Sequence, residues 1–114
     1  ADQRDDLVYN RDVGEAVFRA ATVATLSAHV FHIGTGRLSG LGEVTEALRK
    51  ICPDLKVSIG PGLDYYGGTI GSYCCFDIGQ AREVLGYAPR YDLAKGVHDY
   101  AELLKLLDLT PGVA

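Results

Sequence analysis

Residues 76–91, which read FDIGQAREVLGYAPRY, constrain the fold of this chain more than any other stretch. Asp77 can cap a helix, Gly86 can end it in the left-handed conformation, and Pro89 then keeps the helix from resuming. These signals predict a short helix with a defined start and end. Asp92 predicts the cap of a final helix, whose inward face carries Leu93, Val97, Tyr100, Leu104 and Leu107.

Two more helices are expected in the first half of the chain. Asp12, followed three residues later by Glu15, forms an aspartate version of the capping box, and an apolar stripe continues to about Leu26. A second amphipathic helix is expected over residues 41–51, because Pro53 stops it. Short strands are expected at residues 6–10, 29–33, 55–59 and 73–76. The element order predicts an α/β fold, with a small, partly parallel sheet and flanking helices in one domain over residues 1–114.

Composition narrows the class of protein. The chain has 114 residues, 47% hydrophobic and 23% charged, which is typical of a globular domain. A net charge of −4 argues against nucleic acid and anionic membranes as partners. No apolar run approaches the roughly 20 residues of a membrane-spanning helix, and no leader is recognisable, so a cytoplasmic location is expected. The absence of methionine is consistent with a piece of a longer protein, and equally with removal of an initiator methionine before Ala1.

The cysteines do not form a metal or disulfide pattern. Cys52, Cys74 and Cys75 are odd in number and lack C-x-x-C spacing, so buried reduced thiols are expected. A zinc site that combines them with histidines is disfavoured, because His29 and His32 lie three apart and would face opposite sides of a strand. No bound metal is predicted.

Gly34-Thr35-Gly36 follows an expected strand and precedes an expected helix. This placement suggests a phosphate cradle, in which free backbone amides meet the anion. Ser39 stands where the dinucleotide fingerprint needs its third glycine, and no acidic ribose-binding residue follows at the required distance. A tight strand-to-helix turn is therefore the favoured interpretation.

Tyr91 and Lys95 have the Y-x-x-x-K spacing of a catalytic tyrosine and lysine on one helical face. Here the spacing misleads, because Asp92 is expected to cap the helix and would leave Tyr91 in front of it. The favoured interpretation is a packing tyrosine and a solvated lysine, and no catalytic residue is predicted.

A glycine-rich stretch over residues 60–72 is predicted to be a loop. Long loops in compact domains are often functional, and aromatic faces and carboxylates are suited to sugars. Asp64, Tyr65 and Tyr66 are therefore candidate ligand-binding residues. An irregular surface loop, with tyrosines that cover the edge of the core, remains the alternative.

Four blocks of the chain together resemble the C-terminal region of the extended short-chain dehydrogenase/reductases, the NAD(P)-dependent sugar epimerases and dehydratases. Residues 7–16 are similar to the family's Phe-Val-His/Tyr-Val-x-Asp-Val-Ala-x-Ala segment, and residues 30–36 to its Val-Tyr-Asn-Ile-Gly-Ser/Thr-Gly. The helix at residues 41–48 resembles its Ser-x-x-Glu-Val-Ala-Glu-Ala-Leu, and residues 77–91 resemble its ending. The blocks occur in family order.

The resemblance implies a substrate-binding portion without its nucleotide-binding partner. In the family, the glycine-rich NAD(P) fingerprint, the catalytic Ser/Thr and the working Tyr-x-x-x-Lys lie in the preceding part of a much longer chain. None of these is found here, so this chain alone is expected to hold no cofactor and to be catalytically silent. NAD or NADP is implied for the full-length parent.

The resemblance also bears on the substrate. Arginines that would neutralise a nucleotide pyrophosphate are replaced, by Asp5 near the start and by Gly60-Pro61-Gly62-Leu63-Asp64 in the later loop. No basic residue lies between Lys56 and Arg82. A plain sugar or a sugar acid is therefore favoured over a nucleotide sugar, with the candidates to meet a carboxylate being Arg37, Arg4 and Arg11. The predicted substrate-binding set is Gly34, Thr35, Gly36, Arg37, Asp64, Tyr65 and Tyr66.

Two classes of function remain open. The first is the substrate-binding portion of an NAD(P)-dependent epimerase, dehydratase or dehydrogenase. The second is a stand-alone module that binds a small ligand or a protein without redox chemistry. A portion of a larger enzyme would expose the apolar face that meets its missing half, so self-association into a homo-oligomer is possible for it.

Overall fold

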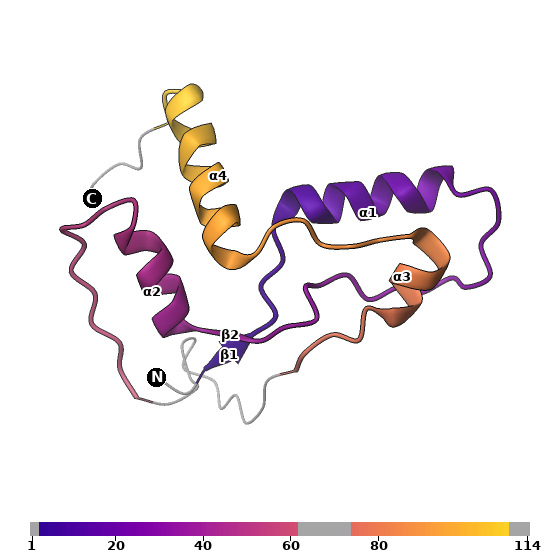
Figure 1. Cartoon of the computed structure of the whole chain (residues 1–114), viewed down its shortest axis with the longest axis horizontal. Coiled ribbons are helices and arrows are strands. Elements are labelled where there is room, and N and C mark those ends of the chain that lie inside the picture. Colours follow the sequence, from indigo (N-terminus) through magenta and orange to yellow (C-terminus); the bar gives the residue numbers. More distant parts are fainter. Residues whose placement is uncertain (1–2, 62–73, 110–114) are drawn as a thin grey trace.

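The computed structural model describes residues 3–61 and 74–109 and confirms a mixed α/β chain (Figure 1). Two short strands in these ranges pair antiparallel, with Arg4 opposite Gly40 and Asp5 opposite Ser39. In chain order the elements are β1 (Arg4–Asp5), α1 (Asn10–Thr22), β2 (Ser39–Gly40), α2 (Leu41–Arg49), α3 (Gly79–Leu85) and α4 (Leu93–Leu106).

The expected partly parallel sheet is wrong for the described residues, where the one strand pairing is antiparallel. Residues 29–33, 55–59 and 74–76 have no assigned strand, and the first strand lies at Arg4–Asp5 instead of residues 6–10. A strand exists only through a ladder with a neighbour. Local alternation of apolar residues indicates an extended backbone but does not supply that neighbour.

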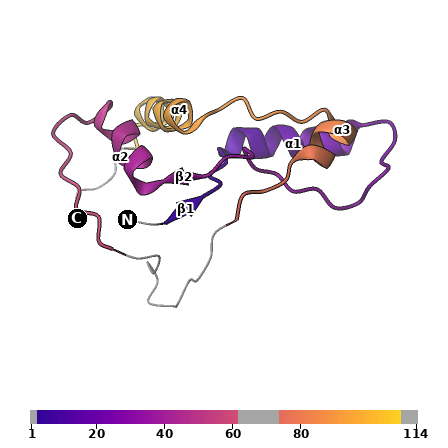
Figure 2. The same ribbon diagram turned by 60° about the horizontal axis from the view of Figure 1, so that its bottom comes forward.

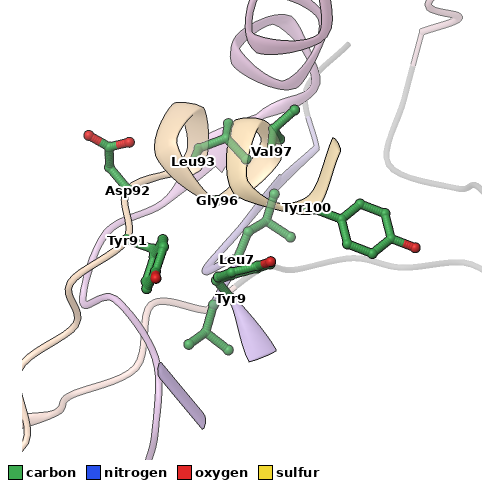
Figure 3. A pocket seen from close by; sticks show the side chains of 9 residues that line it. Leu7, Tyr9, Tyr91, Asp92, Leu93, Gly96, Val97 and Tyr100 are labelled. Carbon is green, nitrogen blue, oxygen red and sulfur yellow. The ribbon is translucent and has the colours of Figure 1, made fainter. Parts of the chain in front are cut away.

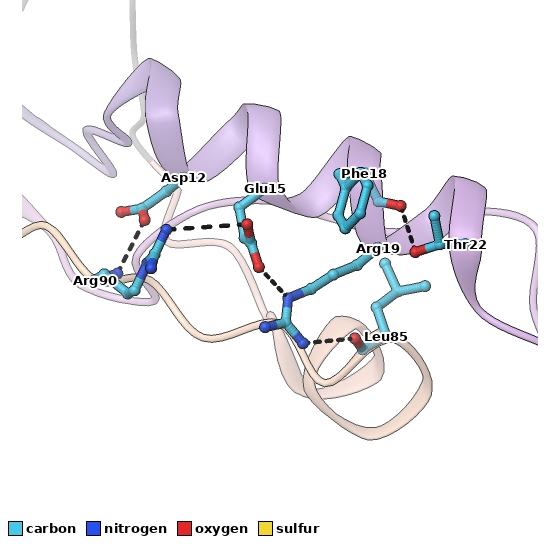
Figure 4. Close-up of polar contacts among 7 residues, drawn as sticks. All are labelled: Asp12, Glu15, Phe18, Arg19, Thr22, Leu85 and Arg90. Carbon is cyan, nitrogen blue, oxygen red and sulfur yellow. Dashed lines mark hydrogen bonds and ion pairs between the residues drawn. The ribbon is translucent and has the colours of Figure 1, made fainter.

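Helix α1 begins earlier than its sequence signal suggested. Its N-cap is Tyr9, which makes no side-chain capping bond, so the proposed capping role of Asp12 is wrong. The Asp12 side chain is fully buried and accepts hydrogen bonds from the backbone amides of Arg90 and Tyr91, both at 3.0 Å. Asp12 therefore joins α1 to the segment that leads into α4. The contact to Arg90 is drawn in Figure 4.

Helix α1 also holds α3 in place through Arg19. The Arg19 Nε donates to Glu15 Oε1 at 2.7 Å, and its Nη1 donates to the carbonyl oxygen of Leu85 at 3.5 Å (Figure 4). The positively charged Arg19 side chain thus meets a carbonyl at the C-terminus of α3, where the helix dipole favours it.

Helix α1 ends at Thr22, short of the predicted Leu26, and Val23 has an extended backbone.

The ends predicted for α3 and α4 are largely confirmed. Gly86 has a left-handed φ of 63°, as its predicted role as a helix stop requires. Asp92 caps α4, because its Oδ1 accepts from the Lys95 amide at 2.8 Å. The predicted cap of α3 is displaced by one residue, because the N-cap is Ile78 and Asp77 lies before it. The Asp77 Oδ1 accepts from the Gly79 amide at 2.8 Å.

The core lies where α1 meets α3. Figure 2 shows these two helices at one end of the molecule and α2 with α4 at the other, and both pairs are in contact. In the described residues, the buried cluster consists of Ala16, Ile78, Ala81, Leu85 and Tyr87. No helix in these ranges has the length and apolar character needed to cross a membrane.

Candidate functional site

The Gly34-Thr35-Gly36 turn surrounds the carboxylate of Asp6. Oδ1 of Asp6 accepts from the Thr35 amide at 2.7 Å and from the Thr35 hydroxyl at 2.5 Å. Oδ2 accepts from the amides of Gly36, at 3.0 Å, and Phe76, at 3.3 Å. The amides that could have held a phosphate are thus bonded to an anion of the chain itself, which supports the interpretation of a tight turn.

A side chain would be unfavourable at either glycine of the turn. A Cβ atom at Gly34 would lie 2.7 Å from the Asp6 Oδ2, and Gly36 has a φ of +71°. The carbonyl oxygen of Gly34 accepts a 2.8 Å hydrogen bond from the hydroxyl of Tyr87, a buried residue that follows α3. The turn is therefore held from two sides, by Asp6 and by Tyr87.

Asp6 remains charged under ordinary conditions. Burial raises the pKa of its carboxyl, but the hydrogen bonds from Thr35, Gly36 and Phe76 together outweigh burial and hold that pKa below its usual value. A charged acceptor makes each of these bonds stronger than a neutral one would be. We call this arrangement of Asp6, Thr35, Gly36 and Phe76 the Asp6 hub.

A polar cavity of about 320 Å³ opens beside the turn. Its lining includes two residues with hydroxyls, Thr35 and Ser39, and two arginines, Arg37 and Arg90. These side chains come from the turn, from β2 and from the segment before α4. The complete lining is Leu7, Thr35, Arg37, Ser39, Pro89, Arg90, Tyr91, Asp92 and Leu93.

Each arginine of this cavity has an acidic neighbour. Arg37 forms an ion pair with Glu43 of α2, and its Nη1 lies 3.5 Å from the Ser39 hydroxyl. The Nη2 of Arg90 lies 3.9 Å from Glu15 Oε2, a long separation for an ion pair (Figure 4). A guanidinium has five N–H donors, more than these contacts use among the described residues. Both groups can therefore also donate to an anionic ligand.

A second cavity, of about 170 Å³ and mostly apolar, adjoins the first and shares with it Leu7, Tyr91, Asp92 and Leu93 (Figure 3). Its wall includes Tyr9, whose ring centroid lies 4.9 Å from that of Tyr91 at an angle of 56°. The Tyr9 hydroxyl donates to Asp99 Oδ2 at 2.8 Å. Burial and this contact raise the pKa of Tyr9. Polar and aromatic surfaces thus lie next to each other.

Tyr91 lies before α4, as the sequence predicted, so it does not share a helical face with Lys95. The Lys95 ammonium lies 4.8 Å from the centroid of the Tyr91 ring and donates to the carbonyl oxygen of Arg90 at 3.0 Å. Lys95 is exposed, as expected, and its side chain also lies over the tyrosine ring. These contacts fix the segment that carries Arg90 and Tyr91.

The predicted binding residues have different outcomes. Thr35 and Arg37 line the polar cavity, and Gly34 and Gly36 shape the turn beside it. The other three, Asp64, Tyr65 and Tyr66, lie outside the described residues. Sequence reasoning missed the lining residues Ser39 and Arg90 and the hub residue Asp6.

The thiols differ from the sequence prediction. Cys52, Cys74 and Cys75 are all exposed, so the expectation of buried thiols is wrong. The strand that was expected at residues 73–76 is not assigned in the part of it that the structure describes. Across residues 3–61 and 74–109, no group of three or more His, Cys, Asp or Glu could hold a metal ion.

Together, the fold and the site define a mixed α/β protein with an arginine-lined cavity that adjoins an aromatic one. Comparison with known proteins adds no family, since the chain matches no family model, no curated protein and no solved structure.

Proposed function

We propose that this chain is the substrate-binding portion of an NAD(P)-dependent epimerase, dehydratase or dehydrogenase that acts on a sugar or sugar acid. On this proposal the chain alone is catalytically silent, and a nucleotide-binding portion supplies NAD or NADP. Its fold would be the C-terminal part of an extended short-chain dehydrogenase/reductase. The order of the four sequence blocks supports this assignment.

One observation carries the substrate class: Arg37 and Arg90 line the same cavity, together with the hydroxyls of Thr35 and Ser39. Guanidinium groups bind a carboxylate through charge-assisted, often bidentate hydrogen bonds. The Ser39 hydroxyl can both donate to and accept from a sugar, whereas the hydrogen of the Thr35 hydroxyl is donated to Asp6. The adjoining rings of Tyr9 and Tyr91 offer an aromatic wall. A sugar acid uses both kinds of surface.

The exposed side of α1 supports the need for another protein surface. Val17 is 64% exposed and Phe18 is 63% exposed, although both are large apolar residues on adjacent positions of one helix. Apolar side chains gathered at a surface are typical of a contact with another domain or chain. We propose that this face meets the missing nucleotide-binding portion, or a second copy of the chain in its absence.

A calorimetric titration of the chain with glucuronate, gluconate and glucose tests the proposed ligand class. The two acids are expected to bind at least tenfold more tightly than glucose, since one charge-assisted contact is worth about 1.4 kcal/mol or more. Arg37→Gln and Arg90→Gln should each remove most of this preference. Arg49→Gln is the matched control, because Arg49 pairs with Glu46 on α2 and does not line the cavity.

Equal affinity for acids and glucose, or equal effects of all three substitutions, would reject the proposed role of the arginines. A separate assay addresses catalytic silence. When the chain alone is mixed with NAD or NADP and the sugar acid that it binds, the absorbance of the reduced cofactor should not change. Turnover by the chain alone would contradict the assignment as an incomplete enzyme.

A further inference from the structure

Two exposed cysteines lie next to the Asp6 hub. Cys74 and Cys75 are neighbours in the chain, and both are free thiols at the surface. The Cys75 thiol donates to Asp6 Oδ2 across 3.9 Å, and the next amide, that of Phe76, donates to the same oxygen. The pair is therefore open to solvent and in contact with a charged group that holds the turn at residues 34–36.

Adjacent cysteines can form a disulfide only under strain. Neighbouring Cα atoms lie about 3.8 Å apart across a trans peptide, whereas ordinary disulfides join Cα atoms roughly 4.4–6.8 Å apart. Strain raises the reduction potential of the bond, which makes it easy to reduce again. A bond between these two sulfurs would thus be reversible rather than a permanent structural link.

We propose that Cys74 and Cys75 form a reversible oxidation site, at which hydrogen peroxide converts the two thiols into a vicinal disulfide. The Cys74 thiolate attacks one peroxide oxygen, the O–O bond breaks, and Cys74 becomes a sulfenic acid. The Cys75 sulfur then attacks the Cys74 sulfur, and water leaves. In total, two thiols lose two electrons and two protons to one peroxide, which becomes two waters.

The environment of Cys75 assigns the order of these steps. Partial desolvation of its sulfur and the neighbouring Asp6 carboxylate raise the pKa of Cys75, so this thiol is the poorer first nucleophile. Cys74 is accordingly the attacking residue and Cys75 the resolving one. A nearby resolving cysteine is the arrangement that stops oxidation at the disulfide.

Oxidation would loosen the Asp6 hub. The hydrogen bond that the Cys75 thiol donates to Asp6 is lost when the disulfide forms. The Cα atoms of adjacent residues lie closer together than an ordinary disulfide allows, so bringing the two sulfurs together must also turn the backbone that carries the Phe76 amide. Asp6 then retains its contacts to Thr35 and Gly36 only. The change is expected to extend to the contact between the rings of Phe76 and His32, whose centroids lie 5.6 Å apart in the structure.

Intact-mass measurement of the reduced chain after treatment with stoichiometric hydrogen peroxide tests the proposal. The mass should fall by about 2 Da, the two hydrogens lost in a disulfide, and return with dithiothreitol. Alkylation before digestion should then modify Cys52 but neither member of the pair. The Cys52→Ser variant, the matched control, should show the same mass loss.

Single variants separate the two steps. Cys75→Ser should stop at a sulfenic acid on Cys74 that dimedone traps, while Cys74→Ser should resist the peroxide. In a two-dimensional NMR spectrum of the oxidised wild-type chain, the Phe76 and Gly36 amide signals should move and those of α2 should not. The proposal is overturned by sulfinic acid on separate cysteines, by disulfides through Cys52, or by unchanged Phe76 and Gly36 signals.

Discussion

Asp6 connects three segments that lie far apart in the sequence, since its carboxylate binds amides at residues 35, 36 and 76. Replacing it by asparagine keeps the size but removes the charge and turns an NH₂ group toward amides that are themselves donors. We expect Asp6→Asn to lower the free energy of unfolding by about 2 kcal/mol. Urea denaturation at pH 7 measures this value. Asp5→Asn is the matched control, because Asp5 accepts a side-chain hydrogen bond from Gln3.

The same residue gives a pH dependence with a definite sign. The pKa of Asp6 is lower in the folded chain than its ordinary value, so its stabilising effect is present above that ordinary value. The effect is lost as pH falls through the folded pKa. The difference in unfolding free energy between wild type and Asp6→Asn should therefore shrink below pH about 4. A difference that stays constant from pH 7 to pH 3 would show that the charge of Asp6 does not hold the turn.

At the scale of elements, two aspartates near the ends of helices have different roles. Asp12 is fully buried and joins α1 to the Arg90–Tyr91 backbone, whereas Asp92 caps α4 at its exposed start. Asp12→Ala leaves two backbone amides without their charged acceptor and should cost about 3 kcal/mol or more. Asp92→Ala removes one cap and should cost about 1 kcal/mol.

Thermal unfolding followed by circular dichroism compares these two variants directly. A larger loss in Asp92→Ala than in Asp12→Ala would contradict the assigned roles. Asp12→Asn provides a further comparison, because it keeps one oxygen acceptor and should fall between wild type and Asp12→Ala. The Asp12→Ala substitution should also weaken ligand binding, because Asp12 holds the segment that brings Arg90 to the polar cavity.

Helices of this chain could be predicted because their signals are local. Gly86 and Asp92 end one helix and begin the next through contacts within a few residues. The strands could not be predicted in this way, because a ladder depends on a partner elsewhere in the chain. Asp12 shows the same limit within a helix: its spacing to Glu15 fits a capping box, but its bonding partners lie 78 and 79 residues away.

The candidate site was predictable to a similar extent. The glycines of the turn at residues 34–36 are a local signal, and the turn does adjoin the cavity. The anion inside it is Asp6, 29 residues from Thr35, and nothing in the sequence connects the two. Arg90 was visible only as part of residues 77–91, which resemble the ending of the family. Its position beside Thr35 and Arg37 follows from the fold.

At the scale of the whole molecule, the buried core is small and apolar residues remain at the surface. The described residues bury a cluster around α1 and α3, while Phe18 on α1 and Leu106 on α4 are 63% and 81% exposed. A small domain has a thin margin of stability, and burial of such faces against another surface would increase it. This pattern is what we expect of a portion that functions within a larger enzyme.

The most direct test of the proposed assignment is the intact mass of the native protein, purified from its source with an antibody against this chain. We predict a species much heavier than 12.2 kDa, whose peptides include a glycine-rich NAD(P) fingerprint ahead of residue 1. That longer protein should turn over NAD(P) with a sugar acid. A native product of 12.2 kDa would contradict the assignment and favour a stand-alone binding module.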